Sequence, residues 1–159
     1  MANETKFSFE IKKSAENSLA RVGTISTPHG QIQTPAFIPV GTKATVKAVL
    51  PAAMEDLGAQ ALLANAYHLY LQPGPDILDE AGGLAQFMNW PGPTFTDSGG
   101  FQVKKVLAMD AKTFRSDQVI AGNKERLAHV DDDGVTFKSH LDGSMHRFTA
   151  EISMQIQHK

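Results

Sequence analysis

The sequence predicts an α/β fold in which a parallel sheet or barrel follows an antiparallel meander and precedes an antiparallel insertion. Three short apolar segments, residues 36–40, 61–64 and 94–97, recur about 25 to 30 residues apart, and each leads into a polar or glycine-containing loop. Helical patterns separate them, which is typical of βα units. Two Asp-Gly dipeptides between later apolar runs indicate hairpins.

The opening of the chain predicts the meander. Phe7, Phe9 and Ile11 alternate with polar residues, which is the period of a half-buried strand. Residues 20–25 predict a second strand, and a turn at 28–30 leads to Ile32. We expect an antiparallel sheet of the kind that closes one end of a barrel.

The middle of the chain predicts the parallel part. Residues 36–40 read as a buried strand, and residues 45–57 have helical spacing, with Pro51 starting a second short helix that stops at 57–58. A strand at 61–64 ends at Asn65, and helices at 75–81 and 84–88 precede the strand that ends at Asp97. Because parallel strands end at one edge, we expect Val40, Asn65 and Asp97 to meet there.

The C-terminal part predicts a change of pattern. Residues 127–130, 135–139 and 145–148 read as short strands joined by the Asp-Gly turns, so we expect an antiparallel insertion over about 127–148. Thr149 is placed to cap a helix in which Ile152 and Ile156 share a face, with Glu151 in its first turn.

Residues 95–102, FTDSGGFQ, carry the densest chemistry in the chain. A carboxylate, a hydroxyl, two glycines, an aromatic ring and an amide follow one another where a strand gives way to a loop. In α/β sheets and barrels, ligands gather at such strand ends. The structural alternative is an Asx turn at Asp97, because Asp and Ser bond their own backbone and Gly supplies positive φ.

Five stretches of the chain resemble the tRNA-guanine transglycosylase (queuine tRNA-ribosyltransferase) family. The family carries TDSGGFQV as residues 96–103 do here, and four further stretches match in order: 35–42 (PAFIPVGT), 62–69 (LLANAYHL), 72–74 (QPG) and 137–144 (FKSHLDGS). The resemblance covers about residue 7 to the last residue. After Phe-Gln-Val the family usually continues through a Ser/Leu/Gly-containing segment, whereas Lys104 and Lys105 follow here.

The resemblance implies that the chain is the N-terminal portion of a TIM-type (β/α)8 barrel. A complete barrel needs about 250 residues, and family members are more than twice as long as these 159 residues. We therefore expect residues 1–159 to be one incomplete domain, inactive alone because the family's attacking aspartate lies in its second half.

The resemblance also implies roles in exchanging a base on ribose through a covalent ribosyl-enzyme intermediate. Asp97 would be the general acid/base, protonating departing guanine and later taking a proton from an incoming 7-deazaguanine. Gly99 and Gly100, which lack Cβ atoms, would let backbone N–H groups approach a flat purine.

The remaining pocket residues follow from shape and hydrogen-bonding capacity. Phe101 would stack on the base, and Ser98 and Gln102 would hold its polar edges. Asn65 would reach the ribose or support Asp97, and Val40 would line the pocket. Plain core packing is the alternative for both Phe101 and Val40.

Other polar groups are assigned structural roles. We expect Tyr67 and His68 to form a packed, hydrogen-bonded pair and not a catalytic dyad. His140, Asp142 and His146 flank a hairpin turn without thiolate partners, so they are expected to be solvated turn residues and not metal ligands.

Composition limits the classes of partner and cofactor. Fifteen basic and seventeen acidic residues give a net charge of −2, so contacts with nucleic acid must be local. The densest basic groups are Lys43 with Lys47, Lys104–Lys105, and Lys124 with Arg126, and a solvated surface is the alternative for each. Lys104 and Lys105 favour a phosphate contact because they directly follow the pocket motif. With no cysteine, the chain cannot build the structural zinc site that the family holds with cysteines and a histidine, so no cofactor is expected here.

The expected partners are tRNA and a guanine or 7-deazaguanine base, with a homodimer left open. The absence of cysteine and of an apolar run of about 18 to 20 residues favours a cytoplasmic location and no membrane contact. Two other functions stay open: a non-catalytic partner subunit or RNA- or protein-binding fragment, and an unrelated phosphate-sugar barrel enzyme.

Overall fold

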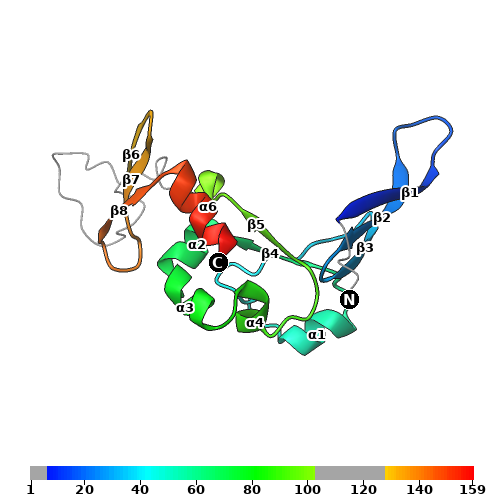
Figure 1. Ribbon diagram of the computed structural model, residues 1–159, viewed down its shortest axis with the longest axis horizontal. Helices are drawn as coiled ribbons and strands as arrows, with labels where there is room; N and C mark the ends of the chain where they lie inside the picture. Colours follow the sequence, from blue (N-terminus) through cyan, green and yellow to red (C-terminus); the bar gives the residue numbers. More distant parts are fainter. Residues whose placement is uncertain (1–6, 103–127) are drawn as a thin grey trace, which may run out of the picture.

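The computed structural model describes residues 7–102 and 128–159, which form three sheets and short helices in a mixed α/β arrangement. Figure 1 shows sheet β1–β2–β3 at one end, sheet β6–β7–β8 at the other, and the parallel pair β4–β5 with the helices between them. The predictions at Lys104, Lys105, Lys124 and Arg126, and those for the loop after Val103, lie outside the described residues.

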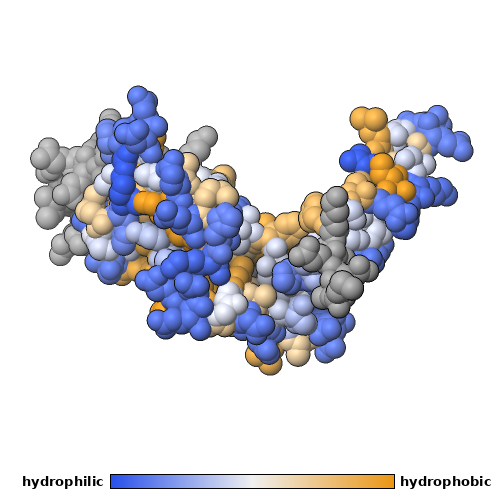
Figure 2. Space-filling model, viewed as in Figure 1, coloured by the Kyte–Doolittle hydropathy of each residue, from blue (hydrophilic) through white to orange (hydrophobic). Residues whose placement is uncertain are grey.

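The first sheet contains β1 (Ser8–Ser14), β2 (Arg21–Thr27) and β3 (Gly30–Thr34), paired antiparallel in chain order. The prediction that β1 is half-buried is wrong, because every residue of β1 is exposed. The strand lies at the edge of the sheet, where β2 provides its hydrogen-bonding partner and no described element covers its apolar side chains. Figure 2 shows these side chains as an apolar patch facing the hollow of the molecule.

The parallel pair consists of β4 (Leu62–Asn65) and β5 (Thr94–Asp97), in register from Leu62 opposite Thr94 to Asn65 opposite Asp97. The predicted strand at 36–40 is reduced to one parallel bridge between Val40 and Leu63. It is also not buried, since Phe37 is 85% exposed. Pro39 accepts a bond from Leu63 but has no N–H to donate, so the ladder cannot extend.

The helices between these strands are α1 (Pro51–Asp56), α2 (Ala66–Leu71), α3 (Pro75–Glu80) and α4 (Leu84–Met88). The start of α1 at Pro51, α3 and α4 confirm the sequence pattern. The predicted helix at 45–50 is wrong, because Ala48 has a φ of 61° and α-helical residues need φ near −63°. Helix α2, which begins directly after Asn65, was not predicted.

The third sheet contains β6 (Ala128–Asp131), β7 (Gly134–Lys138) and β8 (Met145–Phe148), also antiparallel in chain order. Helix α6 (Ala150–His158) follows, and the Thr149 hydroxyl accepts a hydrogen bond from the Ile152 N–H over 3.3 Å, as an N-cap should. Ile156 is buried, while Ile152 packs against the core from a partly buried position.

Aromatic side chains join α2 to the third sheet. The ring centroids of Tyr67 and Phe137 are 5.3 Å apart, and those of Tyr70 and Phe148 are 5.5 Å apart. Tyr67 and Phe137 are 1% and 0% exposed, so this contact is in the core. The sheet therefore packs on the helix that follows β4. Among the described residues, no helix combines the length and hydrophobicity needed to cross a bilayer.

Candidate active site

The carboxylate of Asp97 lies at the end of β5 and is held on both oxygens. The Asn65 Nδ2 donates to Oδ2 over 2.6 Å, and the Gly99 N–H donates to Oδ1 over 2.9 Å. The Gly99 bond is the Asx turn that the sequence offered as an alternative. The Asn65 bond crosses from β4 and is the contact expected at a shared edge.

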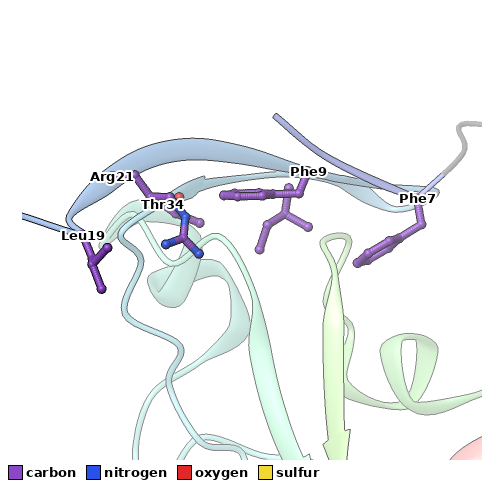
Figure 3. A pocket seen from close by; sticks show the side chains of 6 residues that line it. Phe7, Phe9, Leu19, Arg21 and Thr34 are labelled. Atoms are coloured by element: carbon purple, nitrogen blue, oxygen red, sulfur yellow. The ribbon is translucent and has the colours of Figure 1, made fainter. Parts of the chain in front are cut away.

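Asp97 is only partly buried, so the held carboxylate remains within reach of solvent. Two grooves in the described residues lie elsewhere. One lies against the first sheet, where Phe7, Phe9 and Arg21 line it (Figure 3), and the other lies between α1 and α4. Asp97 lines neither groove.

Gly99 serves a different purpose from the one expected. It has a φ of 73°, and a Cβ built on it would lie 2.6 Å from the Cβ and 2.7 Å from the backbone nitrogen of Tyr67. The missing Cβ thus permits close packing on α2, and its N–H is used by Asp97. Gly100 is less crowded, since within residues 7–102 and 128–159 its Cβ would meet only the Ser98 hydroxyl, at 3.5 Å.

The side chains after the turn lie outside the core. Phe101 is 74% exposed and Val40 is 49% exposed, so the core-packing alternative is wrong for both. Ser98 accepts a bond from the Gly100 N–H over 3.4 Å, and its backbone carbonyl accepts one from Ser153 over 3.1 Å. The turn is therefore tied to α6 as well as to α2.

Gln102 contributes a polar atom without a partner. Its Oε1 is buried and has no hydrogen bond within the described part of the chain. A buried acceptor left unpaired costs about 1–3 kcal/mol. The amide is therefore suited to accept a bond from a ligand or from a residue outside the described ranges.

The rings of Tyr67, His68 and His140 form a cluster next to this turn. The Tyr67 hydroxyl and His140 Nδ1 share a hydrogen bond of 3.3 Å, and burial raises the pKa of Tyr67, which keeps the proton on the phenol. The centroid of the His68 ring lies 5.1 Å from the Tyr67 ring centroid and 6.5 Å from the His140 ring centroid. Tyr67 and His68 are packed as predicted, but Tyr67 bonds His140 and not His68.

His68 responds to the charges around the site. Burial lowers its pKa, and the nearby His140 and Lys43 lower it further, whereas the Asp97 carboxylate raises it. The balance favours a neutral imidazole at pH 7. Its Nδ1 is buried without a hydrogen-bond partner in the described residues.

A second hydrogen-bond chain holds the loop between β7 and β8. Tyr70 bonds His146 Nδ1 over 3.0 Å, His146 Nε2 bonds the Ser144 hydroxyl over 2.7 Å, and that hydroxyl donates to Asp142 over 2.7 Å. Hydrogen bonds from Ser144 lower the pKa of Asp142 to about 2. The prediction of a solvated residue is therefore wrong for His146. The described residues contain no group of three or more side chains suited to a metal ion.

Comparison with known proteins identifies the family. The family model described as "Queuine tRNA-ribosyltransferase" matches residues 16–159. The chain belongs to the queuine tRNA-ribosyltransferase family.

Individual queuine tRNA-ribosyltransferases match at high identity. The relative from Herpetosiphon aurantiacus is 52% identical over 140 residues, which cover 88% of this chain and 31% of the relative. That from Desulforudis audaxviator is 46% identical over 149 residues, covering 94% of this chain and 35% of the relative. The chain thus spans about a third of the length of these relatives.

Membership of this family gives the site a context that geometry alone does not. The matched region contains the Asp97 turn, Asn65 and the two Tyr–His pairs. Two contributors escaped the sequence reasoning. The sequence predicts only that Tyr67 packs and hydrogen-bonds with His68, and no local signal indicates its contact with the Asp97 turn or the link between Tyr70 and His146.

Proposed function

We propose that the protein containing this chain exchanges guanine for a 7-deazaguanine base at the wobble position of tRNA. One observation carries the proposal: in a chain of this family, the Asp97 carboxylate is held by Asn65 and Gly99 at the paired ends of two parallel strands. Partial exposure leaves the carboxylate able to exchange a proton with a ligand.

In the first half-reaction, a carboxylate from a part of the protein outside residues 1–159 attacks C1′ of the ribose. The bond between C1′ and guanine N9 breaks, its electron pair stays on N9, and Asp97 in its acid form protonates the departing base. The ribose remains attached to the protein through an ester bond.

In the second half-reaction, the Asp97 carboxylate takes the proton from N9–H of the incoming 7-deazaguanine. N9 then attacks C1′ and the ester bond breaks, which releases the nucleophilic carboxylate. Asp97 ends with the proton that it needs for another cycle, so both half-reactions balance through one side chain.

The neighbouring residues suit the binding of a flat, polar base. The Phe101 ring is exposed and suited to stack on a base, and the buried Gln102 Oε1, which has no hydrogen-bond partner among the described residues, is suited to accept a bond. Asn65 acts as the support that fixes Asp97 in the absence of substrate.

The parallel pair β4–β5 supports a larger architecture. We infer that β4 and β5 are part of a TIM-type barrel completed by residues that the relatives carry beyond this matched third. The sheet β1–β2–β3 would lie at one end of that barrel. A structural zinc would be held outside this chain, which has no cysteine to bind it, and a homodimer is compatible with this architecture.

The test uses a chimera in which residues 1–159 replace the matching third of the Herpetosiphon relative. Incorporation of labelled guanine into tRNA should occur in the chimera and fall by about 100-fold or more in Asp97→Asn, which cannot cycle a proton. Asp133→Asn, on the exposed turn between β6 and β7, is the matched control and should leave the exchange unchanged.

Two outcomes would contradict the proposal. Full activity of Asp97→Asn would remove Asp97 from the chemistry. A folded chimera that binds tRNA without exchanging guanine, beside an active parent, would support the non-catalytic alternative.

A further inference from the structure

Lys43 lies beside the candidate active site without belonging to the chemistry described above. It follows the bridge that joins Val40 to β4, in a turn closed by the Ala44 N–H donating to the Gly41 carbonyl over 3.2 Å. Its side chain is partly buried. The Nζ atom donates to the Gln72 Oε1 over 2.7 Å, which holds the ammonium group at the end of α2.

The charge of Lys43 is not neutralised by an ion pair in the described ranges. The ion pairs found there involve other residues, and the partner of Lys43 is a neutral amide. Gln72, to which Lys43 donates, is the C-cap of α2, the helix that carries His68 and begins directly after Asn65. In agreement with this placement, Lys43 lowers the pKa of His68 and Asp97 raises it. His140, which lies next to His68 from the loop between β7 and β8, also lowers the pKa of His68.

We propose that Lys43 contacts a backbone phosphate of tRNA next to the nucleotide whose base is exchanged. The proposal rests on the function proposed above, which brings a polyanion to this edge of the sheet. It assigns to Lys43 the binding of substrate and no part in proton transfer.

A phosphate fits Lys43 better than other ligands do. The whole chain carries a net charge of −2, so attraction of tRNA depends on local cations. A lysine ammonium is a point charge with three donors, one of which Gln72 uses. The remaining donors and the full charge match a phosphate oxygen better than they match a neutral base edge.

The experiment measures binding of an anticodon stem-loop to the chimera, so it does not require catalysis. Lys43→Gln should weaken binding by about 3- to 10-fold and lower the slope of log K against log salt by about 0.7 to 1. In exchange assays KM for tRNA should rise while kcat stays the same. Lys43→Arg should restore the binding, because it keeps the charge.

The position of the phosphate is found with stem-loops that carry one uncharged methylphosphonate. At one linkage flanking the exchanged guanosine, the replacement should weaken binding to the wild type but not to Lys43→Gln. If the losses of binding from the methylphosphonate and from Lys43→Gln add at every linkage, the lysine does not contact any of these phosphates and the proposal is overturned. The matched control is Lys47→Gln, an exposed lysine in the same loop, which should keep the wild-type response at that linkage.

A structural readout separates this inference from the proposed function. By NMR, Lys43→Gln should raise the pKa of His68, since the neighbouring positive charge is lost. An unchanged His68 pKa would place Lys43 away from the site and overturn the inference. The inference would also be overturned if Lys43→Gln changed only the melting temperature and not the binding of the stem-loop. A chimera without exchange activity would count against the proposed function, whereas the binding results would still decide the role of Lys43.

Discussion

The side chains of Asn65 and Asp97 meet across two parallel strands, with Nδ2 donating to Oδ2 over 2.6 Å. The two residues are also register partners, the last pair of the β4–β5 ladder. Strand pairing therefore sets the position of both Cα atoms before any side chain is placed. Asn65 then precedes α2, so the position of Asp97 depends on how that helix packs.

Removal of the Asn65 amide should weaken the fold and the site together. Asn65→Leu has a similar shape but leaves Asp97 Oδ2 without its donor, and we expect a loss of about 1 to 3 kcal/mol in the free energy of unfolding. Urea denaturation of the chimera measures this loss. Asn65→Asp would place two carboxylates together, so its stability should recover as the pH falls and one of them takes a proton. An Asn65→Asp variant that is as stable as wild type at pH 8 would contradict this arrangement.

The two glycines of the turn should differ sharply in tolerance. Gly99→Ala combines a φ of 73° with a Cβ 2.7 Å from the Tyr67 backbone nitrogen, so we expect a loss of about 2 kcal/mol or more. Gly100→Ala adds a methyl group that, among the described residues, makes only an ordinary contact with the Ser98 hydroxyl, and it lies in a helical residue, so it should be neutral or stabilising by up to about 1 kcal/mol. Thermal denaturation of the two variants side by side gives the comparison, and equal effects would sink the packing argument.

Acidification should destabilise the protein through His68. Its pKa in the folded state lies below the ordinary 6.5, so the unfolded chain binds more protons between those two values. The resulting stability is present above pH 6.5 and is lost as the pH falls toward the folded pKa. Denaturation at a series of pH values should show a shallower dependence in His68→Gln. An identical slope in this variant would exclude His68 as the source.

The ion pair between Arg147 and Asp131 should be visible in one titration. The Arg147 guanidinium donates to both carboxylate oxygens, over 2.5 and 2.7 Å, and these bonds lower the pKa of Asp131 to about 2 from its usual 3.8. Arg147→Gln should raise the Asp131 pKa toward 3.8, as measured by carboxyl NMR. Asp142 is an internal control, since Ser144 and not Arg147 lowers its pKa.

The same pair gives a pH dependence of defined sign. A carboxyl whose pKa is depressed on folding stabilises the protein above pH 3.8 and loses that contribution as the pH falls toward about 2. Because both groups are exposed, the effect on the free energy of unfolding should be small.

The sequence predicts those elements whose signals are local. Pro51 starts α1, Thr149 caps α6, and Asp-Gly turns separate β6 from β7 and β7 from β8. Each of these signals acts through the residue's own backbone or its nearest neighbours, so it needs no knowledge of the rest of the fold.

The errors occur where distant contacts decide the structure. The apolar residues of β1 alternate as in a half-buried strand, but burial requires a covering element that alternation alone does not reveal. Residues 45–50 have helical spacing, yet Ala48 adopts positive φ within a tight loop that leads to α1. Helix α2 has too few residues to show a periodic pattern.

The candidate site shows the same division. Its residues were identified from one contiguous run and from Asn65, and their contact follows from parallel pairing. The link from Tyr67 to His140 spans 73 positions and has no local signature. The packing of Gly99 against Tyr67 also has no local signature. A turn that needs positive φ accounts for a glycine at this position, but it does not indicate which residue packs against it.

The contact between Gly99 and Tyr67 also limits how the turn after Asp97 can be redesigned. The obstructing atoms at position 99 include a main-chain nitrogen, which a smaller amino acid at position 67 would leave in place. Mutant libraries should therefore hold position 99 constant and diversify position 100, where an added methyl group meets little. Of the two adjacent glycines, only Gly100 is therefore suited to substitution.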